Sequence, residues 1–347
     1  MSPGMLAIRA DADARIGLGH AMRCFALAEA WCKQGGEAVF FSGAALPDPV
    51  LARLDDAGIE HRTFAAPDTG DEFAAAAAGI GARWLVVDGS FVTPGYLDKA
   101  RNAGLPVLLL DDAATGGRYP CDLLLNQNVQ ALPENYAGHT DATILAGPGF
   151  ALIRADMRES IQPRMIPERP QRILVLVGGA DPGGHLEALA QAAARALLKA
   201  GLGDGHVDAV IGPASSWKPP ADAGPIIAYH RGVKDMGALI AEADLAISSA
   251  GSTVWELSLQ GTPMILGASV PVEEPVGAGM AAKGAALYLG RFSDCPAEQL
   301  VAETVRVLQD SAVRRKLSTT ASALVDGRGA ERVIDAMLGI GAGTGIP

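Results

Sequence analysis

Short apolar runs alternate along this chain with segments whose apolar residues recur at helical spacing. In the first half the apolar runs predict strands at Met5–Arg9, Glu37–Ser42, Trp84–Val87, Pro106–Leu110, Cys121–Leu125 and Thr143–Ala146. Helical patterns separate them at His20–Gln34, Asp48–Ala57, Asp71–Gly79 and Gly95–Asn102. Such alternation is typical of a parallel sheet with crossover helices.

The alternation stops at Asp156–Arg172, a charged segment with three prolines that we interpret as a connection between domains. It then restarts, with strands predicted at Arg172–Val177, Val207–Ile211, Pro225–Tyr229, Leu245–Ser248 and Pro263–Leu266. Helices are predicted at Gly184–Lys199, Val233–Glu242, Thr253–Gln260, Gly277–Gly284, Ala297–Gln309 and in two further stretches that end near Leu338. The pattern predicts an α/β protein with two Rossmann-like domains, 1–160 and 161–340, whose parallel sheets face a cleft, and a tail at 341–347.

Composition narrows the class of protein. Of 347 residues, 49% are hydrophobic and 19% charged, which is typical of a folded globular protein. No apolar run approaches the roughly 20 residues of a membrane span, and the N-terminus lacks a signal-peptide pattern, so we expect a cytoplasmic protein. A net charge of −11 argues against nucleic acid and anionic membranes as partners. We expect a monomer that binds a small molecule.

The loop after the first predicted strand contains the candidate for a catalytic residue. Gly17 and Gly19 let the backbone approach a ligand, and the helix that follows offers unpaired N–H groups to phosphate. His20 stands at that helix start, where the macrodipole favours a neutral imidazole that could act as a general base. The loop lacks full G-x-G-x-x-G spacing, which disfavours a dinucleotide site. The structural alternative is a tight turn that His20 caps.

Two loops of the second domain are also candidates for ligand binding, because small residues follow a predicted strand in each. Gly179 and Asp181 lie in a glycine-rich turn after the restarted first strand, and a plain glycine loop is the alternative. Further on, the segment Ser248–Pro263 reads as a strand end followed by a helix start, where Ser252 and Thr253 leave room for a pyrophosphate. Glu256, one turn later, could bind both hydroxyls of a ribose, or could be a solvated helix charge.

Polar residues also follow three strands of the first domain. Asp88, Asp111 and Asn126 are placed where parallel sheets bind ligands, although loop capping is the alternative for each. The sequence contains no metal-ligand cluster, and we expect neither a metal nor a cofactor.

These pieces together resemble the UDP-2,4-diacetamido-2,4,6-trideoxy-β-L-altropyranose hydrolases of pseudaminic acid biosynthesis. The matching segments span nearly the whole chain: Arg9-Ala10-Asp11, Ile16–His20 with Arg23, Asp111-Asp112, Cys121–Asn126, Phe150–Arg154, Gly178–Asp181 and Ser248–Pro263. The last segment also looks like the UDP-binding segment of the glycosyltransferase that completes lipid II. Two positions depart from the pattern, because Gly89-Ser90 replace His-Tyr and Val272-Glu273 replace Asn-Gln.

The resemblance implies a two-Rossmann (GT-B) fold and a UDP-sugar substrate. It implies that His20 activates water for inverting attack at the anomeric carbon, without a metal. Gly17 and Gly19 would then let the sugar-phosphate approach, Ser252 and Thr253 would hold the pyrophosphate, and Glu256 the ribose. Arg9 and Asp11 would also bind substrate. A glycosyltransferase with a UDP-sugar donor, or a noncatalytic nucleotide-sugar binding protein, remains an alternative. Acidic residues outnumber basic ones in residues 1–150, which disfavours a transferase that docks on an anionic membrane.

Overall fold

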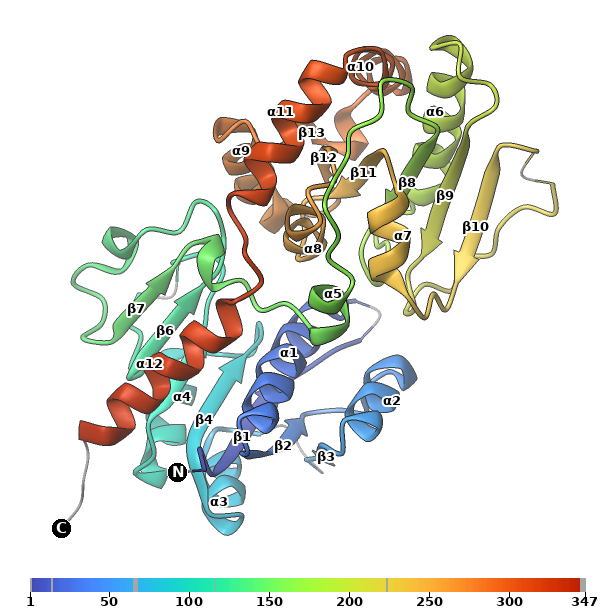
Figure 1. Ribbon diagram of the computed structural model, residues 1–347. Coiled ribbons are helices and arrows are strands. Elements are labelled where there is room, and N and C mark those ends of the chain that lie inside the picture. The colour runs from blue at the N-terminus through green and yellow to red at the C-terminus, as the bar shows by residue number, and fades with distance from the viewer. Residues whose placement is uncertain (1, 14, 65–67, 116, 223, 344–347) are drawn as a thin grey trace. The chain divides into compact units, whose positions relative to one another are not determined.

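The computed structural model describes residues 2–13, 15–64, 68–115, 117–222 and 224–343 (Figure 1). They form two compact units. Unit 1 contains the described residues within Met1–Asp13, His20–Ala155 and Gly327–Pro347, and unit 2 contains those within Ala14–Gly19 and Asp156–Asp326.

Unit 1 is built on a seven-stranded parallel sheet in the order β3-β2-β1-β4-β5-β6-β7. The strands are β1 (Met5–Ala10), β2 (Glu37–Ser42), β3 (Glu60–Thr63), β4 (Ala82–Asp88), β5 (Val107–Leu110), β6 (Leu123–Asn126) and β7 (Thr143–Ala146). The central strands are buried almost throughout, as expected of a sheet that is covered on both faces. The strand order reverses between β1 and β4, and ligands of such sheets bind beyond the carboxyl ends of the strands at that point.

The helices of unit 1 are α1 (Gly19–Lys33), α2 (Asp48–Asp56), α3 (Asp71–Gly79), α4 (Pro94–Ala100) and α12 (Gly329–Gly343). Buried side chains of α3 and α4, including Phe73 and Leu97, share one core with alternate residues of the strands, such as Ala7, Leu85 and Leu109. Because side chains alternate across a strand, the intervening residues face the other side of the sheet.

Helix α12 returns to unit 1 after the whole of unit 2 (Figure 1). Its Arg332 donates to the backbone oxygen of Gly149 at 2.8 Å. At its first residue, Gly329, an added Cβ would lie 2.2 Å from the backbone oxygen of Ala151. Helix α12 therefore packs on unit 1, whereas the predicted division placed 161–340 in one domain. Apolar periodicity predicts a helix but does not tell which sheet the helix packs on.

Unit 2 contains a six-stranded parallel sheet in the order β10-β9-β8-β11-β12-β13. Its strands are β8 (Arg172–Leu176), β9 (His206–Ile211), β10 (Ile227–Arg231), β11 (Leu245–Ser249), β12 (Met264–Ala268) and β13 (Leu287–Arg291). The order again reverses between the first and fourth strands, here β8 and β11, as in dinucleotide-binding sheets.

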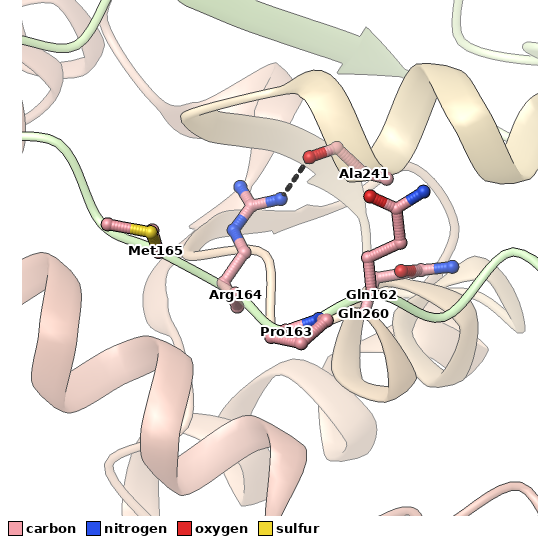
Figure 2. Close-up of a pocket in the computed structure, with 6 residues that line it drawn as sticks. All are labelled: Gln162, Pro163, Arg164, Met165, Ala241 and Gln260. Atoms are coloured by element: carbon pink, nitrogen blue, oxygen red, sulfur yellow. Dashed lines mark hydrogen bonds between the residues drawn. The ribbon is translucent and has the colours of Figure 1, made fainter.

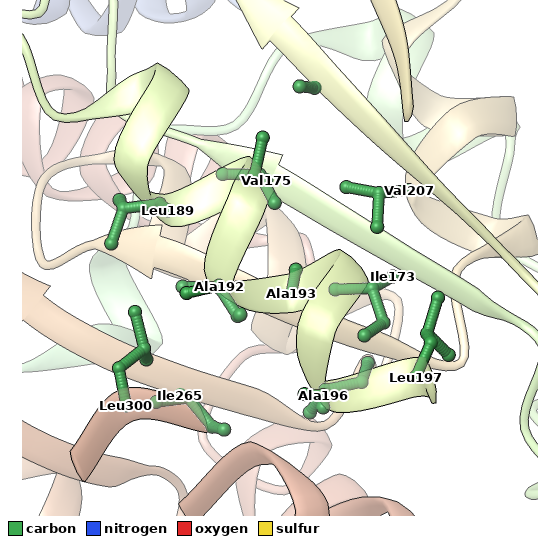
Figure 3. Close-up of a cluster of buried hydrophobic side chains, with 14 of the residues drawn as sticks. Ile173, Val175, Leu189, Ala192, Ala193, Ala196, Leu197, Val207, Ile265 and Leu300 are labelled. Atoms are coloured by element: carbon green, nitrogen blue, oxygen red, sulfur yellow. The ribbon is translucent and has the colours of Figure 1, made fainter. Parts of the chain in front are cut away.

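The helices of unit 2 are α6 (Leu186–Lys199), α7 (Met236–Glu242), α8 (Thr253–Leu259), α9 (Glu274–Ala282), α10 (Ala297–Gln309) and α11 (Ser311–Ser322). Figure 3 shows the core that α6 and α10 form with the sheet, in which Leu189 and Leu300 lie near Val175 and Ile265. Apolar residues three or four apart on α6 face this core, and this spacing is the reason that the helix could be predicted from the sequence.

The predicted fold class of two Rossmann-like parallel-sheet domains is confirmed. Among the residues that the structure describes, two edge strands and one α-helix were not predicted. Strand β3 contains no apolar residue and β13 is half-exposed, so neither forms a buried apolar run. Helix α5 (Ala155–Glu159) is a short helix at the start of the predicted connection and buries Met157. Within the described ranges, no helix is both long and apolar enough to cross a membrane.

Candidate functional site

His20 is the second residue of α1, the helix that follows β1, and Asp88 ends the neighbouring strand β4. The His20 Nδ1 atom lies 2.7 Å from Asp88 Oδ1. About a quarter of the His20 side chain is exposed, whereas Asp88 has no exposed surface. Unit 1 therefore brings the predicted base and a strand-end carboxylate together at the point where its strand order reverses.

The pKa of His20 is raised from its usual 6.5, chiefly by the charge of Asp88, and burial opposes this shift only in part. This direction is opposite to the prediction from the sequence, in which the helix N-terminus favours the neutral ring. The macrodipole typically contributes about 0.3–1 kcal/mol, and up to about 2 kcal/mol at partly buried positions, whereas Asp88 is an ionised carboxylate in direct hydrogen-bond contact with the ring.

Arg23 lies one helical turn after His20 and binds two carboxylates at once. Its Nε and one terminal nitrogen donate to the two oxygens of Asp88, each at 2.6 Å. Its two terminal nitrogens donate to Asp112 at 2.7 and 3.0 Å. The planar guanidinium thus forms two bidentate pairs, an arrangement that lysine could not reproduce.

These contacts keep Asp88 ionised although it is buried. Burial alone would raise the pKa of Asp88, but the charges and hydrogen bonds of Arg23 and His20 outweigh it and hold that pKa well below its usual value. The pKa of Asp112 is lowered in the same way, because Arg23 outweighs the effect of burial. Cys24 also directs its thiol at Asp88, 3.5 Å away.

The network continues to the next strand end. Asn128 donates from its side chain to Asp112 Oδ1 at 3.0 Å. Asn126, a predicted substrate-binding residue, is buried; it donates to the Tyr136 hydroxyl and accepts from the backbone N–H of Asn128. Tyr136 in turn donates to Asp111 at 2.7 Å. Asp111 and Asn126 therefore lie at the predicted sheet edge, and their side chains bind Tyr136.

Arg9 and Asp11, at the end of β1, form a second cluster. Arg9 donates to Asp11 at 2.7 Å and to Asp68 at 3.2 Å, and its guanidinium stacks over the Phe91 ring. Asp11 also accepts from the backbone N–H of Gly43 at 2.7 Å. Arg9 is only 3% exposed, so its charge serves to join the loops around β1.

Arg23 was not among the candidate site residues that the sequence predicts, whereas Asp112 and Asn128 follow strands at the sheet edge where ligands were expected. Arg23 is separated from its two carboxylate partners by 65 and 89 residues. The available signals were its spacing of three from His20, which places both on one helix face, and its presence in the matched motif.

In unit 2, the loops after β8 and β11 are adjacent. An added Cβ at Gly178 would lie 3.8 Å from the Ser249 hydroxyl, and one at Gly179 would lie 3.0 Å from Leu18. An added Cβ at Gly19 would lie 3.6 Å from the Ser252 hydroxyl. Gly17 has a positive φ of 78°, which explains a glycine in this turn.

Asp181 has a local structural role. Its carboxylate oxygens accept from the backbone N–H groups of His185 and Leu186, at 2.9 and 3.1 Å, and so cap the start of α6. It does so with a left-handed backbone conformation, φ 49°. In this structure Asp181 therefore acts as a helix cap, a role that differs from the predicted substrate contact and from the plain glycine loop that was the alternative.

Ser252 and Thr253 stand at the start of α8, and Glu256 follows one turn later and is half-buried. Glu273, at one of the positions that depart from the family pattern, lies beside this loop: its Oε1 would be 3.0 Å from a Cβ added at Gly251. Its Oε2 accepts from the Ser269 N–H at 2.7 Å, and burial raises its pKa.

A small cavity of about 90 Å³ lies elsewhere in unit 2, between the connecting segment and the end of α7 (Figure 2). Arg164 lines it and donates to the backbone oxygens of Ala241 and Ala243, which caps the helix C-terminus. The cavity contains none of the predicted site residues. Among the residues that the structure describes, no group of three or more His, Cys, Asp or Glu side chains is arranged to hold a metal ion.

No protein-family model matches this chain. The spore coat polysaccharide biosynthesis protein SpsG of Bacillus subtilis (strain 168) is 26% identical over 194 residues, which are 55% of this chain and 56% of SpsG. The chain thus spans about half the length of the curated relative that it matches.

Solved structures resemble the chain over nearly its whole length. MurG of Acinetobacter baumannii is 17% identical, with a TM-score of 0.64 over 97% of this chain and 99% of that one. A putative UDP-N-acetylglucosamine 2-epimerase from Listeria monocytogenes is 16% identical, with a TM-score of 0.67 over 99% and 98%. MnaA of S. aureus, in complex with UDP, is 12% identical, with a TM-score of 0.67 over 97% and 96%. At these identities the similarity shows the fold, and this chain has the GT-B fold.

Proposed function

We propose that this protein hydrolyses a UDP-linked diacetamido-trideoxyhexose to UDP and the free sugar. The observation that carries the proposal is the pair of His20 and Asp88, 2.7 Å apart, at the carboxyl edge of the unit 1 sheet. A histidine that is about a quarter exposed and has a buried carboxylate on one ring nitrogen is suited to general base catalysis. The motif resemblance supplies the substrate class, and the polysaccharide biosynthesis named for SpsG supports a role in glycan assembly.

In the proposed reaction, His20 accepts a proton from water and the water oxygen attacks the anomeric carbon. The bond between that carbon and the UDP oxygen breaks, and its electron pair leaves with UDP, so the configuration inverts. Ser252 and Thr253 bind the pyrophosphate, and Glu256 binds the ribose hydroxyls. Gly17, Gly19 and Gly179 allow the sugar-phosphate to approach the backbone. The site uses no cofactor in this proposal.

The test is incubation of the full chain with a panel of UDP-diacetamido-trideoxyhexoses, without an acceptor, while UDP release is followed by phosphorus NMR. Release of UDP and free sugar supports the hydrolase. Release that requires an added acceptor would instead identify a glycosyltransferase, and tight retention of the UDP-sugar without turnover would identify a binding protein. Either of these two results overturns the proposal.

The proposed cellular setting is the cytoplasm, and we propose a monomer with a small-molecule substrate. Light scattering of the purified chain tests the oligomeric state, because a dimer would scatter as twice the 35.6 kDa mass.

A further inference from the structure

The contacts of His20 determine which of its two ring nitrogens holds a proton. Asp88 is ionised and can only accept hydrogen bonds, so the 2.7 Å contact to Nδ1 requires a proton on Nδ1. Arg23 lies 3.2 Å from the same nitrogen but already donates to Asp88 and Asp112 at shorter distances. A neutral His20 therefore has its lone pair on Nε2.

We infer that Asp88, Arg23 and Asp112 are positioning residues, which hold the His20 ring so that Nε2 receives the proton of the attacking water. The inference deepens the proposed function and rests on it for the identity of the reaction. Asp88 acts through a direct hydrogen bond to the ring. Arg23 and Asp112 act one step further away, by fixing the orientation and the ionisation of Asp88.

Burial explains why Asp88 needs this support. A carboxylate without exposed surface would otherwise be protonated or would rotate towards other donors. The fork of Arg23 occupies both oxygens of Asp88, and its hydrogen bonds to Asp112 fix the guanidinium in turn. Asn128 fixes Asp112 from the adjacent strand end. The side chains of Asp88, Arg23 and Asp112 thus each have one orientation in which all of these hydrogen bonds form.

The charges of the cluster favour proton uptake by His20. With a neutral ring, Arg23, Asp88 and Asp112 sum to +1 − 1 − 1 = −1, and with an imidazolium the sum is 0. Three charged groups act on the ring: Asp88 from β4, Asp112 from the segment after β5, and Arg23 from its own helix. Both carboxylates favour the imidazolium and Arg23 opposes it. The cluster therefore stabilises the charge that develops on His20 as water is deprotonated.

Nitrogen NMR of the full chain with ¹⁵N-labelled histidine tests this inference without any substrate. The variant His20→Asn identifies the signal of His20 among the six histidines. In the unmodified protein above its titration midpoint, we expect Nδ1 to be protonated and Nε2 bare. In Asp88→Asn, we expect a lower midpoint and a changed ratio of the two neutral ring forms, because the acceptor that selects Nδ1–H is lost.

A second test measures kcat and KM of the variants with the UDP-sugar that the substrate panel identifies. Asp88→Asn is expected to lower kcat by about 10²–10⁴-fold, the range for loss of an oriented base. KM should change less than about threefold, because the variant removes no substrate contact. Arg23→Lys keeps the charge but loses the fork, and is expected to lower kcat as well. Asp98→Asn is the matched control, since Asp98 is an exposed carboxylate of unit 1 paired with Arg118, and it should leave kcat and the midpoint unchanged.

A bare Nδ1 in the unmodified protein, or an unchanged midpoint in Asp88→Asn, would overturn the inference. If Asp88→Asn does not fold, Asp112→Asn replaces it, because that change removes a more exposed carboxylate and should still lower the midpoint. The two proposals fail separately. Absence of hydrolysis with the expected NMR result rejects the hydrolase alone, whereas hydrolysis with an unchanged midpoint rejects the positioning role alone.

Discussion

His20 is the residue on which the proposed chemistry depends most directly. Replacing it with Asn keeps a similar volume and polarity but removes a group that can accept a proton at neutral pH. We expect kcat for UDP-sugar hydrolysis to fall about 10²–10⁴-fold, while UDP affinity measured by calorimetry stays the same. His139→Asn is the control, because His139 is an exposed histidine of the same unit. A fully active His20→Asn enzyme would remove His20 from the mechanism.

The pH dependence of activity follows from the raised pKa of His20. Asp88 favours the imidazolium, so the neutral ring that can accept a proton dominates only above a pH higher than 6.5. We expect kcat/KM to rise with pH through a midpoint above 6.5. The same shift stabilises the folded state below pH 6.5, and that contribution is lost as the pH rises through the folded-state pKa. A kinetic midpoint at or below 6.5 would contradict the proposed base.

Glu256 is the residue that should determine nucleotide affinity. If its carboxylate accepts both ribose hydroxyls, Glu256→Ala should weaken UDP binding by about 1.5–3 kcal/mol, the range for hydrogen bonds to a charged group. Calorimetry with UDP measures the difference. Glu303→Ala serves as the control, since Glu303 pairs with Arg306 on the surface of the same unit. Equal affinities in the two variants would assign Glu256 to a solvated helix position.

Among individual residues, the sequence predicted where side chains lie better than what they bind. His20, Asp88, Asp111 and Asn126 do lie at the carboxyl ends of the unit 1 strands. Their partners come from distant parts of the chain, and no local pattern contains that information. Asp181 illustrates the reverse case, because its hydrogen-bond partners are only four and five residues away in the sequence.

At the scale of elements, buried strands and amphipathic helices were predictable because burial on both faces produces apolar runs and burial on one face produces helical spacing. Strand β3 was not predictable, since the edge of a sheet can be formed by Glu60, His61, Arg62 and Thr63 through backbone hydrogen bonds alone. Helix α12 was predicted as a helix near Leu338, but its packing on unit 1 was not.

Two glycines of α12 test how closely that helix packs. An added Cβ at Gly329 would lie 2.2 Å from the backbone oxygen of Ala151, whereas one at Gly339 meets no described atom within 4 Å. We expect Gly329→Ala to destabilise the protein by about 1–3 kcal/mol, as overpacking does. Gly339→Ala should stabilise it by about 0.5–1 kcal/mol, because alanine favours the helix. Urea unfolding compares the variants, and equal stabilities would show that α12 does not pack tightly at Gly329.

At the scale of the whole molecule, the strand order of both sheets places strand-end loops where ligands bind in this fold. The two units contribute different chemistry to the proposed reaction. Unit 1 contains a histidine whose environment favours proton uptake, and our proposal assigns nucleotide binding to the small residues at the start of α8 in unit 2. If His20 activates water as proposed, the reaction is expected to break the bond on the sugar side of the glycosidic oxygen.

The bond that breaks separates this mechanism from most pyrophosphate chemistry. Cleavage of a P–O bond commonly uses a divalent cation held by clustered carboxylates. The two adjacent carboxylates of unit 1 that could suggest such a cation site are Asp111 and Asp112. Asp112 accepts hydrogen bonds from Arg23, and Asp111 accepts one from Tyr136. Attack at the anomeric carbon needs only a base and a stabilised leaving group. We therefore expect the oxygen of ¹⁸O-water to appear in the sugar, and turnover to persist in excess EDTA. Mass spectrometry of both products decides: label in UDP would reject the mechanism even if the sugar were released.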